Sequence, residues 1–224
     1  MFEKRFRDRA EAGEQLAEAV ASRGIGKDAL VYALPRGGVP IATAVAGRIG
    51  ARLDILFVRK LGVPHQPELA FGAVMDGVHP EVVLNPEIVE AAGLTEPVIE
   101  AVRDRELEEI ERRREHYLAD HEPVDPRGRT CIVVDDGLAT GATAKVALHG
   151  LRSAGAAQLI LAVPVAPVDT LEAMAGEADE IICLETPRPF YGVGAAYQAF
   201  PQLRDVDVIA ALERAKRTEP SEAP

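Results

Sequence analysis

Residues 131–143 read CIVVDDGLATGAT, and this stretch decides the fold. Its leading apolar residues predict a strand that is buried on both faces. Asp135 and Asp136 end the strand, where open α/β sheets place their ligand crevice. A loop of small and hydroxyl-bearing residues follows, and the apolar spacing from Ala142 onward predicts a helix. The arrangement indicates a site for a sugar phosphate, because free N–H groups at a helix N-terminus attract phosphate and carboxylates hold hydroxyls or a metal ion.

The same stretch resembles the phosphoribosyl pyrophosphate (PRPP) signature of type I phosphoribosyltransferases, which has two acids followed by a T-G-x-T loop. The resemblance extends over roughly a dozen positions. A Walker P-loop is excluded, because Gly137 and Gly141 are too close together and no Gly-Lys-Ser/Thr follows. In an ordinary strand–helix turn, Asp136 and Thr140 would serve only as turn and cap residues, and the loop carries more polar groups than a cap needs.

The composition limits the class of protein. The chain has 224 residues, which suits one domain spanning 1–217 with a disordered polar tail at 218–224. Its net charge of −11 argues against a general nucleic-acid binder. We expect no membrane association and a cytoplasmic location, because no apolar run approaches the length of a membrane span and the first residues lack the apolar core of a signal peptide. Cys131 and Cys183 lie in apolar runs and are expected to be buried, reduced thiols.

Strand and helix patterns alternate along the chain. We predict strands at 29–34, 53–58, 69–74, 81–84, 131–134, 159–163 and 180–184, and helices at 6–22, 39–49, 96–118, from 142, 168–175 and 203–215. This order predicts an α/β fold with a doubly wound, mostly parallel sheet, and Asp76-Gly77 indicates a hairpin between two short strands. The resemblance adds a small hood subdomain, formed by about 1–24, by 186–200, or by both. Within 96–118, Glu108–Arg112 and Glu109–Arg113 pairs indicate a solvated face.

Two further segments are expected to meet the signature loop. Residues 34–40 read LPRGGVP after the first predicted strand, where the glycines let backbone N–H groups approach an anion and Arg36 adds charge. This turn resembles the family's pyrophosphate loop. Arg59 and Lys60 are expected at the carboxyl end of the second strand, facing the same crevice, with a solvated strand end as the alternative. Residues 61–68 resemble the mobile loop that closes over substrate in this family.

The resemblance implies transfer of the ribose 5-phosphate of PRPP to a nitrogen acceptor, with release of pyrophosphate and dependence on Mg²⁺. Asp135 and Asp136 would bind the ribose hydroxyls, directly or through Mg²⁺. Backbone N–H groups of 139–143 would hold the 5′-phosphate, and Arg36 and Lys60 the pyrophosphate. The residues expected to bind PRPP are Arg36, Gly37, Gly38, Arg59, Lys60, Asp135, Asp136, Gly137, Leu138, Ala139, Thr140, Gly141, Ala142 and Thr143, with Asp135, Asp136, Lys60 and Arg36 in catalytic roles and Asp135 and Asp136 as metal ligands.

The sequence leaves the acceptor open. Family members that act on 6-oxopurines usually carry a third carboxylate three positions after the second acid, where this chain has Ala139, so hypoxanthine and guanine are disfavoured. Arg188, Phe190 and Tyr191 could frame a planar base or could simply pack a glycine-rich loop. The alternative function is a non-catalytic PRPP-binding regulatory protein. The cations expected around the pyrophosphate favour a catalyst, and the family resemblance implies small-molecule substrates and a homodimer.

Overall fold

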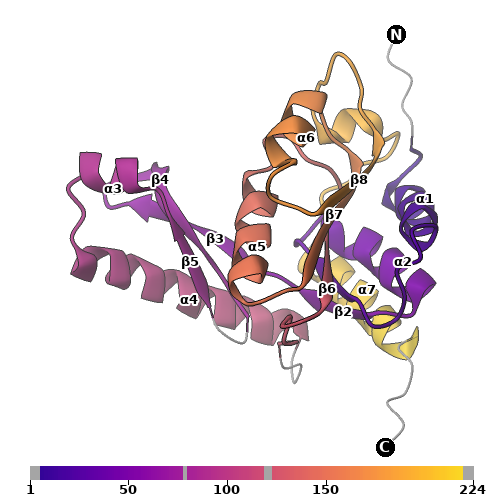
Figure 1. Cartoon of the computed structure of the whole chain (residues 1–224), viewed down its shortest axis with the longest axis horizontal. Helices are drawn as coiled ribbons and strands as arrows, with labels where there is room; N and C mark the ends of the chain where they lie inside the picture. The colour runs from indigo at the N-terminus through magenta and orange to yellow at the C-terminus, as the bar shows by residue number, and fades with distance from the viewer. Residues whose placement is uncertain (1–5, 78–79, 119–122, 219–224) are drawn as a thin grey trace, which may run out of the picture.

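The structure is a computed structural model that describes residues 6–77, 80–118 and 123–218. A five-stranded parallel sheet with flanking helices forms the main part, and a three-stranded antiparallel sheet projects to one side (Figure 1). The parallel sheet confirms the predicted α/β fold. Its strands, in spatial order, are β2 (Arg52–Ile55), β1 (Leu30–Ala33), β6 (Thr130–Val134), β7 (Gln158–Val165) and β8 (Glu180–Glu185).

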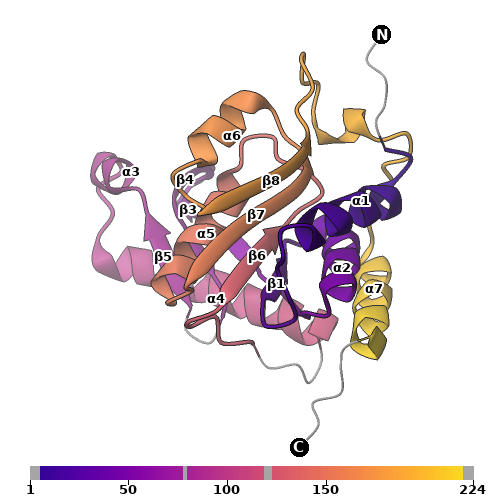
Figure 2. The same ribbon diagram turned by 45° about the vertical axis from the view of Figure 1, so that its right-hand side comes forward.

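Helices cover both faces of the parallel sheet (Figure 2). Helices α1 (Arg9–Ala21), α2 (Gly38–Ile49) and α7 (Asp205–Thr218) lie on one face, and α5 (Ala142–Ser153) and α6 (Val168–Met174) lie on the other. Ile132 and Val134 of β6 pack towards α1 and α2, whereas Cys131 and Val133 pack towards α5. This two-sided burial explains why the strand is apolar without alternation.

The antiparallel sheet contains β3 (Val58–Val63), β4 (Gln66–Met75) and β5 (Glu81–Leu84), in that spatial order. Helices α3 (Pro86–Ala91) and α4 (Glu96–Leu118) follow it. The β4–β5 pairing confirms the predicted hairpin. The sequence analysis predicts a strand at 53–58 and a mobile loop at 61–68. Both predictions are wrong, because β2 ends at Ile55 and residues 58–68 contain β3 and the start of β4. Buried Leu61 and Val63 alternate with less buried neighbours, as in a strand covered on one face.

Helix α3 was not predicted, because it is short and has no buried residue. Its start nevertheless carries a sequence signal. Asn85 caps the helix by accepting from the N–H groups of Glu87 and Ile88, and Pro86 occupies the first helical position.

Arg114 of α4 joins the two sheets through a buried ion cluster. Its Nη2 atom donates to Asp54 of β2 at 3.0 Å, and its Nη1 atom donates to Asp76 after β4 at 2.6 Å. The side chains of Arg114, Asp54 and Asp76 are 8%, 4% and 7% exposed. The prediction of a solvated helix face is therefore wrong at Arg114. Each carboxylate also accepts a backbone N–H, from Val124 and from Phe57 respectively.

The exposed part of α4 carries the expected short-range pairs, with one change of partner. Arg113 donates to Glu109 at 2.7 Å, which confirms that predicted pair. Arg112 also donates to Glu109, at 2.8 Å, instead of to Glu108. These exposed pairs contribute little to the free energy of unfolding, whereas the enclosed Arg114 cluster contributes to how the two sheets are joined.

The two segments suggested for a hood lie together beside the parallel sheet. Phe6 and Tyr197 form a parallel bridge, and their ring centroids are 5.4 Å apart. A 3₁₀ turn, η1 (Val193–Ala196), directly precedes Tyr197. Which elements act as the hood stays a prediction. Apart from Thr218, the predicted tail lies outside the described residues, and no helix in the described ranges combines the length and apolar character that crossing a membrane requires.

Cys131 and Cys183 are both free thiols. Cys131 is fully buried and Cys183 is partly buried. Burial raises the pKa of Cys131 to about 12 and that of Cys183 to about 11. Neither thiol therefore has the thiolate character that a nucleophile requires.

Candidate active site

The parallel pairing of β1 with β6 brings two sequence-distant turns together. Ala33 and Val134, the last residues of these strands, are register partners. The turn that contains Arg36 and the loop that begins at Asp135 therefore leave the sheet at the same edge, as predicted.

The loop after β6 contains backbone N–H groups that have no acceptor among the described residues. Ala139 and Thr140 are exposed, and Gly141 caps α5 with φ of 72°, in the left-handed region. Among the described residues, none accepts a hydrogen bond from the N–H groups of Ala139, Thr140, Gly141 or Thr143. An exposed turn with free donors at a helix N-terminus is a binding site for an anion.

Contacts on either side fix the shape of this loop. The Leu138 N–H donates to the Val165 carbonyl at 2.9 Å, and the Thr170 hydroxyl donates to the Ala139 carbonyl at 2.7 Å. Gly137 has φ of +153°, and a Cβ there would lie 2.6 Å from Val193. The glycine is therefore required by both the backbone angle and the packing, which explains why no branched residue occupies this position.

Asp135 and Asp136 are both partly buried at the head of the loop. The Asp136 N–H donates to Oδ1 of Asp135 at 2.8 Å. Burial, together with the neighbouring Asp136 charge, holds the pKa of Asp135 well above its usual range. Burial also raises the pKa of Asp136, and the guanidinium of Arg9 acts in the opposite direction. The end of a strand at a ligand crevice predicts a solvent-facing Asp136, and this prediction is wrong because the side chain is only 13% exposed.

Arg9 is the site residue that the sequence did not reveal. Its Nε atom donates to Oδ2 of Asp136 at 2.8 Å, although the two residues are 127 positions apart in the chain. Asp8 caps α1 by accepting from the Glu11 N–H, which places Arg9 at the first helical residue, next to the sheet edge. That N-cap is the only local signal that could have drawn attention to it.

The turn after β1 contacts the same carboxylate. A Cβ added at Gly37 would lie 2.0 Å from Oδ2 of Asp136, so the carboxylate occupies the space where a side chain would be. A Cβ at Gly38 would lie 2.5 Å from the Val134 carbonyl oxygen. Both glycines are thus needed for the close approach of the two turns.

Arg36 is exposed, and its side chain turns towards the start of α7. Its Nη1 atom donates to the Leu203 carbonyl at 2.9 Å, and its Nε atom lies 3.2 Å from Oδ1 of Asp205. The hydroxyl of Tyr117 donates to the same carboxylate oxygen. Arg36 therefore lies at the predicted edge of the sheet and has partners within the protein.

An open pocket of about 460 Å³ separates these groups. It combines two guanidinium groups, one carboxylate and an aromatic ring, a set that suits a ligand with both charged and planar parts. Its lining consists of Arg9, Arg36, Gly37, Asp136, Phe200, Pro201, Gln202 and Leu203.

Arg59 and Lys60 lie within β3 of the antiparallel sheet, not at the end of a parallel strand. Arg59 donates to Glu106 of α4 at 2.9 Å, whereas Lys60 is exposed. The prediction that they lie at the carboxyl end of a parallel strand is wrong, and their contact with PRPP stays a prediction.

The aromatic residues near the C-terminus have separate roles. Tyr197 is fully buried, and its hydroxyl donates to the backbone carbonyl of Asp136 at 2.6 Å. Tyr191 is 74% exposed, and Arg188 is exposed as well. Tyr197 therefore supports the acidic pair from behind, and the framing of a base by Arg188, Phe190 and Tyr191 stays a prediction.

The two aspartates fit a magnesium ion that shares its ligands with a substrate. The described residues contain no group of three or more His, Cys, Asp or Glu side chains suited to hold a metal ion. Mg²⁺ is commonly bound by one or two carboxylates together with substrate phosphates and water. Asp135 and Asp136 match that donor set, although Oδ2 of Asp136 already accepts from Arg9.

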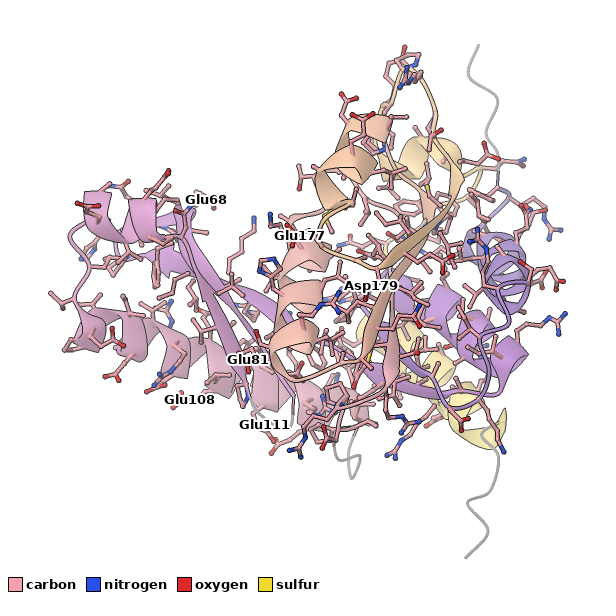
Figure 3. The ribbon with its side chains drawn as sticks, in the orientation of Figure 1. Glu68, Glu81, Glu108, Glu111, Glu177 and Asp179 are labelled. Carbon is pink, nitrogen blue, oxygen red and sulfur yellow. The ribbon has the colours of Figure 1, made fainter. Side chains whose placement is uncertain are left out.

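Other acidic side chains lie outside the site (Figure 3). Glu68, Glu81, Glu108 and Glu111 belong to the antiparallel sheet and α4, and Glu177 and Asp179 lie between α6 and β8. The chain can therefore carry a net charge of −11 and still present the exposed Arg36 at the pocket.

Comparison with known proteins agrees with this geometry. The family model described as "Phosphoribosyl transferase domain" matches residues 7–198. Two curated relatives from Mycobacterium tuberculosis, strains CDC 1551 / Oshkosh and ATCC 25618 / H37Rv, are named "Putative phosphoribosyl transferase MT0597" and "Putative phosphoribosyl transferase Rv0571c". Each is 47% identical over 215 residues, which cover 96% of this chain and 48% of the relative. The chain thus spans about half the length of the curated relatives it matches.

A solved structure is similar over nearly the whole chain. TT1426 from Thermus thermophilus superposes with a TM-score of 0.81 at 39% identity, covering 94% of this chain and 98% of that chain. The chain belongs to the phosphoribosyl transferase family, and its resemblance to the type I members is confirmed. The matched range contains both turns at the sheet edge, together with Arg9.

Proposed function

We propose that this chain is the catalytic domain of a PRPP-dependent phosphoribosyltransferase. It transfers ribose 5-phosphate from Mg²⁺–PRPP to a small nitrogen acceptor, such as a nucleobase, and releases pyrophosphate. One observation carries the proposal: free backbone N–H groups after β6 lie directly beside two adjacent carboxylates. This combination matches the phosphate and the hydroxyls of one ligand, a phosphorylated pentose.

The loop residues bind the 5′-phosphate. The N–H groups of Ala139, Thr140, Gly141 and Thr143 supply donors, and the positive end of α5 adds to the attraction. The Thr140 and Thr143 hydroxyls supply further donors at the same turn. Because contacts on both sides hold the loop, it binds without first having to become ordered.

The carboxylates act on the ribose. Asp135 and Asp136 accept hydrogen bonds from its hydroxyls, and their negative charge stabilises the positive charge that develops at C1 as the bond to pyrophosphate breaks. The nitrogen lone pair of the acceptor forms the new bond to C1, and the bonding electrons leave with the pyrophosphate oxygen. Positioning and charge stabilisation are therefore the main contributions of the protein.

The turn after β1 holds the leaving group. Arg36 and the Gly37 N–H take the pyrophosphate, and Lys60 and Arg59 approach from β3. The Gly38 N–H already donates to the Leu34 carbonyl at 3.0 Å, so Gly38 contributes by allowing the close approach of the two turns. When bound, Mg²⁺ neutralises charge on the pyrophosphate, and Asp135 and Asp136 are the residues that would hold it. Arg36 must exchange its contact with Asp205 for the pyrophosphate.

Other features of the proposed enzyme follow from its family and composition. The acceptor is a small molecule other than a 6-oxopurine, because Ala139 supplies no carboxylate beside the base. We place the enzyme in the cytoplasm, in nucleotide metabolism, as a homodimer. Sizing the protein in solution tests the dimer, and a single-subunit mass would contradict it.

A PRPP-binding regulatory protein is the second candidate, and one observation favours it. Arg9 already pairs with Asp136, and Asp205 already pairs with Arg36. Two of the groups assigned to catalysis are thus engaged within the protein. A regulator can keep such pairs permanently, whereas an enzyme must open at least the second one.

The test is a screen of nucleobases and other amines with Mg²⁺–PRPP, reading pyrophosphate release, combined with calorimetry of PRPP binding. The proposal predicts binding, and pyrophosphate release with at least one acceptor. Binding without turnover on any acceptor would favour the regulator, and absence of binding would contradict both functions.

A further inference from the structure

The Arg9 side chain connects three parts of the molecule. It extends from the first residue of α1 to Asp136, its Nη1 atom donates to the Pro201 carbonyl at 2.8 Å, and its guanidinium carbon lies 3.8 Å from the centroid of the Phe200 ring. Its side chain is only 10% exposed. Three partners of different chemistry thus fix the guanidinium from different directions.

Asp136 is held on its other sides as well. Gly37 contacts its carboxylate, and the Tyr197 hydroxyl holds its backbone carbonyl. Among the described residues, Oδ2 has Arg9 as its partner and Oδ1 has none. The side chain as a whole is 13% exposed. Within the described residues, the carboxylate therefore has one oxygen paired with Arg9 and one oxygen without a hydrogen-bond partner.

Stability alone is a weak reason for such a pair. Removing two charges from water costs about as much as their attraction returns, and a well-packed apolar pair is often as stable. Asp136 lines a pocket of about 460 Å³, and Arg9 pairs with only one of its two carboxylate oxygens. Orientation of the unpaired oxygen explains this arrangement better than stability does.

We propose that Arg9 is a positioning residue that fixes the Asp136 carboxylate, so that Oδ1 faces the ribose hydroxyls of PRPP. The inference rests on the proposed function, because it assigns Asp136 to the pentose. Arg9 acts through Asp136 and does not itself touch the reacting atoms. Phe200 and Pro201 hold Arg9 in turn, so the C-terminal segment contributes to the orientation of the carboxylate.

A double-mutant cycle read by calorimetry of Mg²⁺–PRPP binding tests the proposal. The variants are Arg9→Met, Arg9→Lys, Asp136→Asn and the Arg9→Met/Asp136→Asn double variant. The control is Arg7→Met, because Arg7 lies two residues away on the same segment, is 67% exposed and faces Glu11. Thermal unfolding of each variant shows whether it is folded.

We expect Arg9→Met to weaken binding by about tenfold and Arg9→Lys by about threefold, because an ammonium cannot contact Asp136, Pro201 and Phe200 together. Arg7→Met is expected to bind within about twofold of the wild type. The double variant should bind like Asp136→Asn alone, since Arg9 has no effect once its carboxylate is lost.

Losses that multiply in the double variant would show that Arg9 acts independently of Asp136, and the proposal would be wrong. Wild-type affinity in Arg9→Met would also overturn it. If Arg9→Met does not fold, Arg9→Lys decides by the same criterion: weakened binding supports the proposal, and unchanged binding overturns it. Failure of the wild type to bind PRPP would instead overturn the proposed function, and this inference with it.

Discussion

Two buried arginines, Arg114 and Arg9, hold aspartates by the same chemistry in very different surroundings. Arg114 contacts Asp54 and Asp76, and both carboxylates also accept backbone N–H groups. Arg114 adjoins a cavity of about 20 Å³, room for about one water molecule, and an open pocket of about 530 Å³ that Asp76 also lines. Arg9 holds one carboxylate at the edge of a pocket of about 460 Å³. Both clusters adjoin an open pocket, so the difference between them lies in the number of carboxylates and in the backbone partners of those carboxylates.

The two clusters also differ in charge balance. Arg114 faces two carboxylates that share one cation in an enclosed place, so burial raises the pKa of Asp76 to about 7. Arg9 faces one carboxylate, with Arg36 on the far side of the pocket. Disrupting the Arg114 cluster is therefore expected to lower the free energy of unfolding, and disrupting the Arg9 cluster is expected to weaken ligand binding.

The largest effect is expected from Arg114→Met. It leaves Asp54 and Asp76 buried without their cation, and the free energy of unfolding should fall by about 3–5 kcal/mol. Denaturation by urea measures this change. Arg113→Met is the control, because it removes the neighbouring arginine, which is 41% exposed, and should cost less than about 1 kcal/mol. Equal stability of the two variants would contradict the structural role of the cluster.

A pH series on Asp76→Asn sharpens the comparison. Burial raises the pKa of Asp76 from its usual 3.8 to about 7, so between these values the folded protein binds more protons than the unfolded chain. The stability that this group contributes is complete below its unfolded pKa and lost as pH rises through the folded pKa. Relative to Asp76→Asn, the wild type should lose about 1 kcal/mol of unfolding free energy per pH unit in this window and none above it.

Urea denaturation from about pH 5 to about pH 8 measures this difference. The substitution itself changes absolute stability, so the slopes are compared rather than the values. Parallel curves for the two proteins throughout the series would show that Asp76 stays ionised, and that Arg114 balances both carboxylates.

Gly37→Ala disturbs the open cluster without removing a charge. The backbone of Gly37 has φ of −59°, which alanine adopts freely. The new Cβ would lie 2.0 Å from Oδ2 of Asp136, so it acts by displacing that carboxylate. Losing that carboxylate's position should weaken Mg²⁺–PRPP binding by about tenfold to a hundredfold. Gly47→Ala in the same helix has nothing within 4 Å and should bind normally. Equal affinity of both variants would remove Asp136 from the binding site.

The smallest effect is expected from Asp205→Asn. Asp205 competes for Arg36 through an exposed contact, so removing its charge should tighten pyrophosphate binding by no more than a few-fold. Calorimetry with pyrophosphate and Mg²⁺ measures this change. Asp207→Asn is the control, because it removes a carboxylate of the same helical turn that faces Arg204 instead. Weaker binding in Asp205→Asn would contradict competition, and would mean that Asp205 orients Arg36 for the pyrophosphate.

The sequence predicts the parallel sheet well, because two-sided burial gives its central strands β1, β6 and β7 long apolar runs. The sequence also predicts that the turns after β1 and β6 lie close together, because the carboxyl ends of neighbouring parallel strands lie at the same edge of the sheet. The start of the antiparallel sheet was misread because Val58 continues the apolar run that begins in β2, although the chain changes sheets after Ile55.

The role of Arg9 could not be read from the sequence. Its partner Asp136 is 127 positions away, and the segment around it is rich in exposed charges. Arg114 was missed for a related reason: it sits in a run of three arginines, and only tertiary packing distinguishes the buried one. Local periodicity reports which face of an element is apolar, but not which charged side chain will be enclosed.

The most direct test of the central claim is a crystal structure of the protein with Mg²⁺ and PRPP. We predict the 5′-phosphate on the N–H groups of Ala139, Thr140, Gly141 and Thr143, and the ribose hydroxyls against Asp135 and Asp136. A pentose phosphate bound elsewhere, with this loop empty, would contradict the account.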